Sequence, residues 1–221
     1  MHTDAGASPA PGDAGVARAR REIAAVVGLT IGYVVLQRWI AARWYFIVPA
    51  LVAGLAWLVW TLARSGRTAT DYGVGRRGLL SSSIASATIV GLTLAASLAW
   101  PAGADVAAGD GVSRGFWIAL AAYPVWGVAQ QFLFQGILHE NLIRLGARWW
   151  WSVPCTSAVF VAAHHPSRRL MIATAIGGLL FSAIYRRHRN VVPIGIAHGM
   201  CAAIVYEFVF HRDLFGRFLG L

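Results

Sequence analysis

Residues 123–144 read YPVWGVAQQFLFQGILHENLIR, an apolar run of helical length that polar side chains interrupt at a regular spacing. Gln131, Gln135 and His139 recur every four residues, so an α-helix places them on one face. Amide and imidazole groups are costly inside a membrane span, so they indicate function or a packed polar interior. Two interpretations stay open: the three side chains line a cavity, or they form hydrogen bonds that hold neighbouring helices together.

The composition of the whole chain identifies an integral membrane protein. Of 221 residues, 57% are hydrophobic and only 13% are charged, whereas a soluble domain carries about 25% charged residues. This excludes a soluble fold, a disordered chain and a secreted disulfide scaffold. All 19 basic residues are arginines, set against 9 acidic residues. Because they are scattered between apolar runs without interleaved aromatic residues, no nucleic-acid partner is expected.

The apolar runs predict an all-α polytopic transmembrane bundle of about seven spans, because a bilayer core about 30 Å thick suits runs of about 17–25 residues. The runs cover 22–40, 44–63, 79–100, 115–143, 149–164, 169–186 and 191–210. The domain prediction is a disordered cytoplasmic tail (1–20), two N-terminal helices (21–69), a membrane core (70–210) and a short C-terminal tail (211–221). Most arginines fall in the loops that are inner when the N-terminus is inside, as the positive-inside rule requires. We expect a bacterial cytoplasmic membrane location.

Three short motifs in the core follow one another in a familiar order. They are Gln130-Gln131-Phe132-Leu133-Phe134-Gln135-Gly136, then Phe160-Val161-Ala162-Ala163-His164, then Ile196-Ala197-His198-Gly199. The order resembles that of the CPBP family, the CaaX proteases and bacteriocin-processing intramembrane proteases, which include Rce1-like enzymes. That family carries two glutamates followed by Phe-Arg-Gly, then Phe-x-x-x-His, then a histidine with Asn or Asp four residues later. The resemblance covers about residues 70–210.

The sequence departs from the family pattern where the chemistry is expected. Gln130 and Gln131 stand in place of the two glutamates, Gln135 in place of the arginine, and Ala202 in place of the Asn or Asp. In the family, one glutamate is implied to activate water while the histidines hold that water and stabilise the oxyanion. A general base must accept a proton at the working pH, and a primary amide cannot.

Two other carboxylates are considered as replacements. Glu140 lies nine residues after Gln131, and Glu207 lies nine residues after His198. At 100° per residue this spacing puts each carboxylate on the opposite face of an intact helix, so neither restores the base. Glu140 also precedes Arg144 by four residues, which predicts an ion pair at the inner end of the helix.

The resemblance implies a site with Gln131, His164 and His198 in catalytic positions and four further residues in contact with the substrate. These four are Gln130, Gln135, His139 and Phe160. One hypothesis is a protease-like intramembrane hydrolase with a neutral histidine as base, acting on a membrane-embedded peptide or a prenylated substrate. The alternative is a non-proteolytic relative that binds or transforms a lipid or isoprenoid, or chaperones a membrane partner. Membrane lipids are partners in either case.

A metal site is the third and least favoured hypothesis. His139, His164 and His198 offer three neutral imidazoles to a divalent metal such as zinc, iron or copper. No other cofactor is expected.

Overall fold

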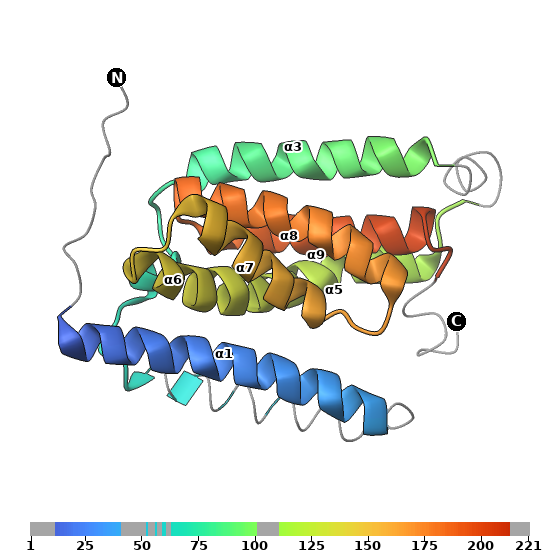
Figure 1. Ribbon diagram of the computed structural model, residues 1–221. Helices are drawn as coiled ribbons and strands as arrows, with labels where there is room; N and C mark the ends of the chain where they lie inside the picture. Colours follow the sequence, from blue (N-terminus) through green and yellow to red (C-terminus); the bar gives the residue numbers. More distant parts are fainter. Residues whose placement is uncertain are drawn as a thin grey trace. The chain divides into compact units, whose positions relative to one another are not determined.

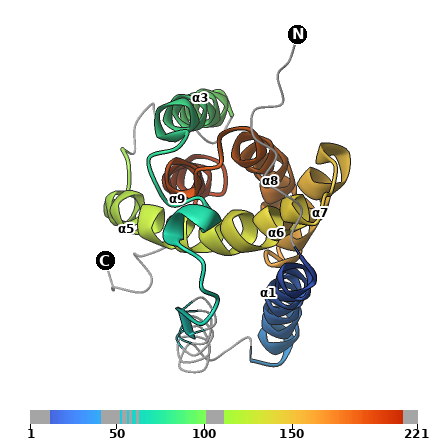
Figure 2. The same cartoon turned by 90° about the vertical axis from the view of Figure 1, so that its left-hand side faces the viewer.

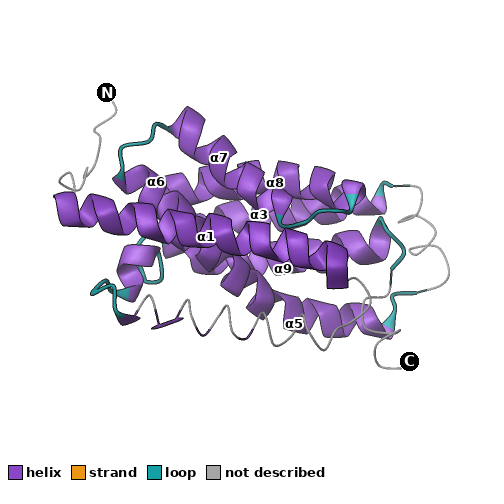
Figure 3. Cartoon of the chain, turned by 60° about the horizontal axis from the view of Figure 1, so that its bottom comes forward, coloured by secondary structure: helices purple, strands orange, loops and turns teal. Residues whose placement is uncertain are grey.

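The computed structural model describes residues 12–40, 52, 56, 59, 60, 63–100 and 111–212. Its secondary structure there is helical, with no strand among these residues (Figures 1 and 3). The predicted all-α fold class is therefore confirmed. Most of the predicted 44–63 helix and the loop 101–110 lie outside the described residues.

The chain divides into two compact units. Unit 1 comprises residues 1–72 and 134–183, and unit 2 comprises residues 73–133 and 184–221.

Unit 1 contains a long first helix that begins earlier than predicted. Helix α1 spans Asp13–Ile40 and packs against α6 (Glu140–Arg144) and α7 (Trp149–Ala162). The predicted disordered tail 1–20 is thus wrong for residues from 13 onward. Alanine and arginine are strong helix formers, Asp13 suits the positive N-terminal end of the helix dipole, and Ala19 is buried.

The rest of unit 1 consists of a 3-10 helix, most of a π-helix and most of α8. The 3-10 helix η1 spans Ala69–Tyr72, the π-helix η3 spans Phe132–His139, and α8 spans Arg168–His188. A Cβ at Gly178 of α8 would lie 2.7 Å from the Ser157 hydroxyl of α7. The absence of a side chain there lets these two helices approach closely.

Unit 2 is built around α9 (Val191–Phe208). Figure 2 shows α9 between α3 (Leu79–Leu98) and α5 (Arg114–Gln131), and α9 contacts both. The core of this unit combines side chains of α5 and α9, namely Phe116, Ala119, Ala203, Ile204 and Phe208. At the same end Glu207 accepts hydrogen bonds from the backbone N–H and the hydroxyl of Ser113, at 2.7 and 2.9 Å. Ser113 is in turn the N-cap of α5.

Three glycines bring the backbones of α5 and α9 into direct contact. A Cβ at Gly127 would overlap the carbonyl oxygen of Gly195, and a Cβ at Gly199 would overlap the Tyr123 carbonyl. A Cβ at Gly195 would overlap the Cα of Val128. The spacing Gly195-x-x-x-Gly199 is typical of closely packed membrane helices.

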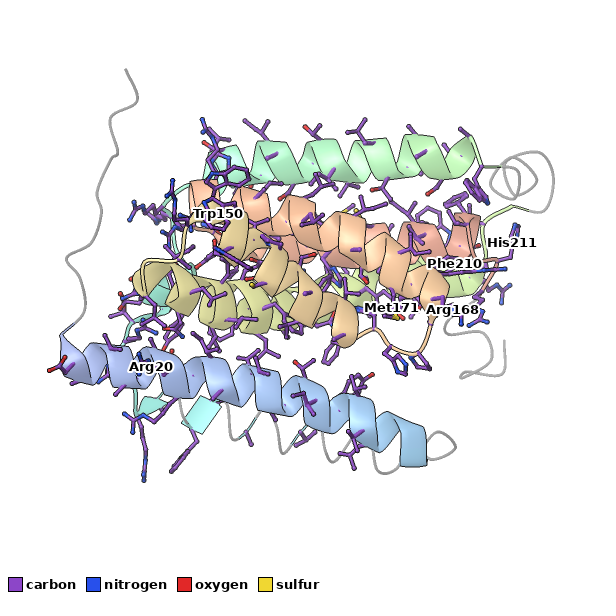
Figure 4. All side chains as sticks on the ribbon, viewed as in Figure 1. Arg20, Trp150, Arg168, Met171, Phe210 and His211 are labelled. Carbon is purple, nitrogen blue, oxygen red and sulfur yellow. The ribbon has the colours of Figure 1, made fainter. Side chains whose placement is uncertain are left out.

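Within the described residues, three helices are long and apolar enough to cross a membrane: α3, α8 and α9. They correspond to three of the seven predicted spans. The predicted run 115–143 is instead divided among α5, the π-helix and α6, and α7 has only 14 residues. Figure 4 shows Arg20 and Trp150 near one end of unit 1 and Arg168 near the other, so α7 and α8 run between opposite ends of this unit.

The predicted orientation is testable by labelling. We expect single cysteines at Thr70 and Val112, both exposed, to react from opposite sides of the membrane, with Thr70 inside. The background replaces both native cysteines, Cys155 and Cys201, because Cys155 is exposed. Access of a membrane-impermeant maleimide to intact and to opened vesicles measures the two sides. Labelling of both positions from one side would contradict the orientation.

Candidate functional site

The seven predicted site residues fall into two groups, and each group lies within one unit. Unit 2 holds Gln130, Gln131 and His198, whereas unit 1 holds Gln135, His139, Phe160 and His164. The shared cavity predicted for both groups stays a prediction.

In unit 2, the close contact between α5 and α9 at their glycines places His198 beside Gln130. His198 lies between Gly195 and Gly199 on α9, and its Nε2 is 3.0 Å from the Oε1 of Gln130 on α5. An amide oxygen only accepts hydrogen bonds, so Nε2 carries the proton. In the neutral ring Nδ1 is then the basic nitrogen.

Gln131, the next residue, has no exposed surface at all. Neither its amide oxygen nor its amide nitrogen has a hydrogen-bond partner among the residues that the structure describes. A buried amide without partners costs about 1–3 kcal/mol, so native structures rarely keep one without a reason. The resemblance described above implies a catalytic glutamate at the position of Gln131, and this role stays a prediction.

The helix that carries these residues changes its winding directly after Gln131. From Phe132 to His139 the backbone forms a π-helix with i→i+5 hydrogen bonds. An ordinary α-helix rotates 100° per residue, whereas the wider turn of a π-helix rotates less per residue. The prediction of an intact α-helix over 115–143 is therefore wrong, and the facing argument for Glu140 does not hold.

The partners of the carboxylates nevertheless argue against their use as a base. Glu140 accepts from Arg144 at 3.0 Å, which confirms the predicted i,i+4 pair. Glu207 is bonded to Ser113 as described above. Both carboxylates therefore have structural partners.

In unit 1, Gln135 and His139 belong to a buried chain of hydrogen bonds. The Gln135 amide nitrogen donates to Ser182 of α8 at 2.9 Å. Its oxygen therefore accepts from Nδ1 of His139, at 2.8 Å, and in the neutral ring Nε2 accepts from the Ser152 hydroxyl of α7 at 3.1 Å. Together the four side chains join the π-helix to α7 and α8. This matches the interhelical interpretation of the polar stripe for these two residues.

His164 lies just after the end of α7, on the aromatic ring of Phe160. The ring centroids are 4.7 Å apart with the planes at 68°. The His164 Nδ1 donates to the Phe160 carbonyl at 2.7 Å, because a carbonyl oxygen only accepts. Phe160 itself is buried and stacks edge-on against Phe134. In the neutral His164 ring, the basic nitrogen is Nε2.

The three-histidine metal hypothesis stays a prediction, because His139 and His164 lie in unit 1 and His198 lies in unit 2. The described part of the chain contains no group of three or more His, Cys, Asp or Glu side chains that could hold a metal ion. Both ring nitrogens of His139 are already bonded, to Gln135 and Ser152. His139 would therefore have to give up one of these two bonds to bind a metal ion.

A buried ionic network that sequence reasoning missed lies in unit 1. Glu22 of α1 accepts from Arg67 and from the Asn141 amide, each at 2.7 Å, and from the Tyr72 hydroxyl at 3.2 Å. Arg67 also donates to the Asn141 oxygen at 2.9 Å. The only signal in the sequence is a lone glutamate at the start of an apolar helix, and nothing local names its partners.

A second, more exposed ion pair lies beside this network. Arg144 pairs with Asp71 at 3.1 Å. Hydrogen bonds from the Thr68 backbone and side chain, and then Arg144, lower the pKa of the Asp71 carboxyl below its usual value. The Asp71 carboxyl therefore stays ionised at a lower pH than the carboxyl of a free aspartate. Its ion pair with Arg144 is lost only when the pH falls below the lowered pKa of Asp71.

Comparison with known proteins agrees with the motif order. Residues 112–204 match the family model described as Rce1-like, type II CAAX prenyl endopeptidase. No curated protein and no solved structure matches the chain. The matched segment includes all seven predicted site residues.

Proposed function

We propose that this membrane protein, whose residues 112–204 match the Rce1-like family model, binds a membrane-embedded peptide, prenylated or not, without cleaving it. The observation that carries the proposal is the fully buried amide of Gln131, which has no partner among the described residues.

The chemistry of Gln131 selects a neutral ligand with both a donor and an acceptor. A primary amide offers two N–H donors and one carbonyl acceptor. A peptide group supplies the complementary carbonyl and N–H, so one peptide bond satisfies both ends of Gln131. A charged ligand would lose its hydration without gaining an opposite charge at this position.

The absence of cleavage follows from the residue types at the family positions. Neither Gln130 nor Gln131 can accept a proton from water. Glu140 and Glu207 are bonded to Arg144 and to Ser113. The part of the family reaction that needs a carboxylate base therefore has no counterpart at these positions.

Hydrolysis remains a second candidate function, and one observation favours it. The bond to Gln130 puts the proton of His198 on Nε2 and leaves the lone pair of the neutral ring on Nδ1. In this mechanism Nδ1 takes a proton from water as the water attacks the substrate carbonyl, and His198 then passes that proton to the leaving amine as the peptide bond breaks. The candidate needs no carboxylate.

A binding assay in nanodiscs tests the proposal. We expect a fluorescent transmembrane peptide to bind the wild-type protein and to be recovered intact. Gln131→Leu keeps a similar volume but removes both hydrogen bonds, so the affinity should fall about 10–100-fold. Gln131→Glu should also weaken binding, because burial disfavours its charge, and should produce no cleavage.

Cleavage by the wild type would decide for hydrolysis, provided that His198→Ala abolishes it and His165→Ala does not. His165 is an exposed histidine outside the matched motifs, so it controls for a general effect of losing an imidazole. Binding that is unchanged in Gln131→Leu would contradict the assignment of the ligand to Gln131.

A further inference from the structure

Unit 2 carries an arginine-rich surface where two distant chain segments meet. Residues 73–78 read GVGRRG and residues 184–190 read IYRRHRN, with no aspartate or glutamate in either. We call their five arginines the arginine patch: Arg76, Arg77, Arg186, Arg187 and Arg189. The contact between the segments is made by backbone and by buried side chains, of which Asn190 forms hydrogen bonds across it.

Asn190 is the residue that holds the two segments together. Its side chain is fully buried, and its amide nitrogen donates to the carbonyls of Gly75 and Arg77, at 2.6 and 3.0 Å. Next to it, the Val191 N–H donates to the Gly73 carbonyl at 2.9 Å. The loop that carries Arg76 and Arg77 is therefore fixed on the start of α9.

A glycine makes the fit close at the other end of the loop. Gly78 has a φ of +61°, and a Cβ there would overlap the carbonyl of His188. Only glycine combines this backbone conformation with this contact. The fold therefore brings arginines of both segments together although like charges repel. An anion beside them would offset that cost.

The position of the arginine patch indicates which kind of anion binds there. Helix α3 begins at Leu79, α8 ends at His188, and α9 begins at Val191. These are the three described helices long and apolar enough to cross a membrane, and the patch lies at the end of each. Leu79 and Leu80 follow it directly and are exposed. The patch thus lies where apolar helix surface gives way to charge, which is the level of lipid headgroups.

We propose that the arginine patch binds the phosphate headgroup of an anionic phospholipid. A guanidinium matches a phosphate with two parallel hydrogen bonds, and basic clusters at the cytoplasmic ends of membrane helices attract acidic headgroups. Arg76, Arg77 and Arg187 are exposed, and none of them pairs with a carboxylate of the described residues. The site is independent of the ligand proposed for Gln131.

The test titrates short-chain phosphatidylglycerol into protein purified in an uncharged detergent and follows the thermal midpoint. The midpoint should rise with the lipid and should not rise with short-chain phosphatidylcholine. In the triple variant Arg76→Gln, Arg77→Gln, Arg187→Gln we expect the same rise to need roughly 100-fold more lipid, since each arginine near an anionic lipid contributes about fivefold.

The matched control is Arg168→Gln, Arg169→Gln, Arg212→Gln, which removes the same charge from exposed positions outside the patch. It should respond like the wild type. Equal responses of the two triple variants would overturn the proposal, and an equal response to glycerol 3-phosphate would overturn the lipid as its source.

Should the patch variant fail to fold, native mass spectrometry of the wild type in mixed lipid decides. Retention of phosphatidylglycerol over phosphatidylethanolamine supports the site, and equal retention contradicts it.

Discussion

Replacing Gly195 and Gly199 together with alanine is expected to unfold unit 2. The new Cβ atoms would overlap the backbone of Val128 and of Tyr123, and a backbone cannot rotate away as a side chain can. Helices α5 and α9 must therefore separate along the crossing. Overpacking costs about 1–3 kcal/mol per site and more where backbone moves, against a total stability of about 5–15 kcal/mol. The thermal midpoint and the monodisperse fraction in detergent measure the loss.

The control for this variant is Gly91→Ala with Gly177→Ala. A Cβ at Gly91 meets nothing within 4 Å, and one at Gly177 meets only Phe181 of its own helix, at 3.5 Å. Alanine is favoured over glycine within a helix by up to about 1 kcal/mol, so the midpoint of this variant should stay or rise. A similar fall of the thermal midpoint in both double variants would contradict a specific requirement for glycine where α5 contacts α9.

Arg67→Met is expected to lower the free energy of unfolding by about 3–5 kcal/mol, because removing one partner of a buried ion pair leaves a buried charge uncompensated. Glu22 is only 4% exposed and Arg67 only 10%. The remaining donors to Glu22, from Asn141 and Tyr72, are neutral. The pair joins α1 to the segment before η1, and Asn141 extends the network to α6. Chemical unfolding of the purified protein measures the change.

The ion pair of Arg144 provides the comparison. Its side chain is 29% exposed and Asp71 is 37% exposed, and solvent-exposed pairs contribute about 0–1 kcal/mol. Asp71→Asn, which removes this pair and keeps the bond of Arg144 to Glu140, should therefore cost much less than Arg67→Met. The double variant Glu22→Gln, Arg67→Met removes both charges and should recover part of the stability. Equal losses in Arg67→Met and Asp71→Asn would contradict the assignment of a buried network.

Features that depend on neighbours in the sequence were predictable. The apolar runs indicated the spans that α3, α8 and α9 occupy, because burial in lipid requires about 20 apolar residues in a row. The pair of Glu140 and Arg144 followed from a spacing of four residues on one helix. The motif order indicated the Rce1-like family, which the match over residues 112–204 supports.

The winding of the helix after Gln131 was not predictable from periodicity. The sequence pattern of three polar residues at a spacing of four suits an ordinary α-helix, and it was interpreted as one. The π-helix from Phe132 to His139 changes the rotation per residue. The helix face on which Glu140 lies therefore does not follow from a rotation of 100° per residue. The spacing of the polar residues is that of an α-helix, whereas the backbone after Gln131 forms a π-helix.

The sequence by itself determined that the chain is an all-helical membrane protein, with amides where the motifs that it resembles have carboxylates, because composition and residue type need no partner to be known. Only the tertiary structure decided what the polar groups do. It bonded His139 to Ser152 and His198 to Gln130, left the buried Gln131 amide without a partner among the described residues, and joined Glu22 to Asn141 across 119 positions of the chain. The bond of His198 to Gln130 depends on the packing of α5 against α9, where glycines allow the backbones to touch, and the bonds of His139 and Glu22 depend on packing within unit 1. Contacts between residues far apart in the chain leave no periodic trace along it.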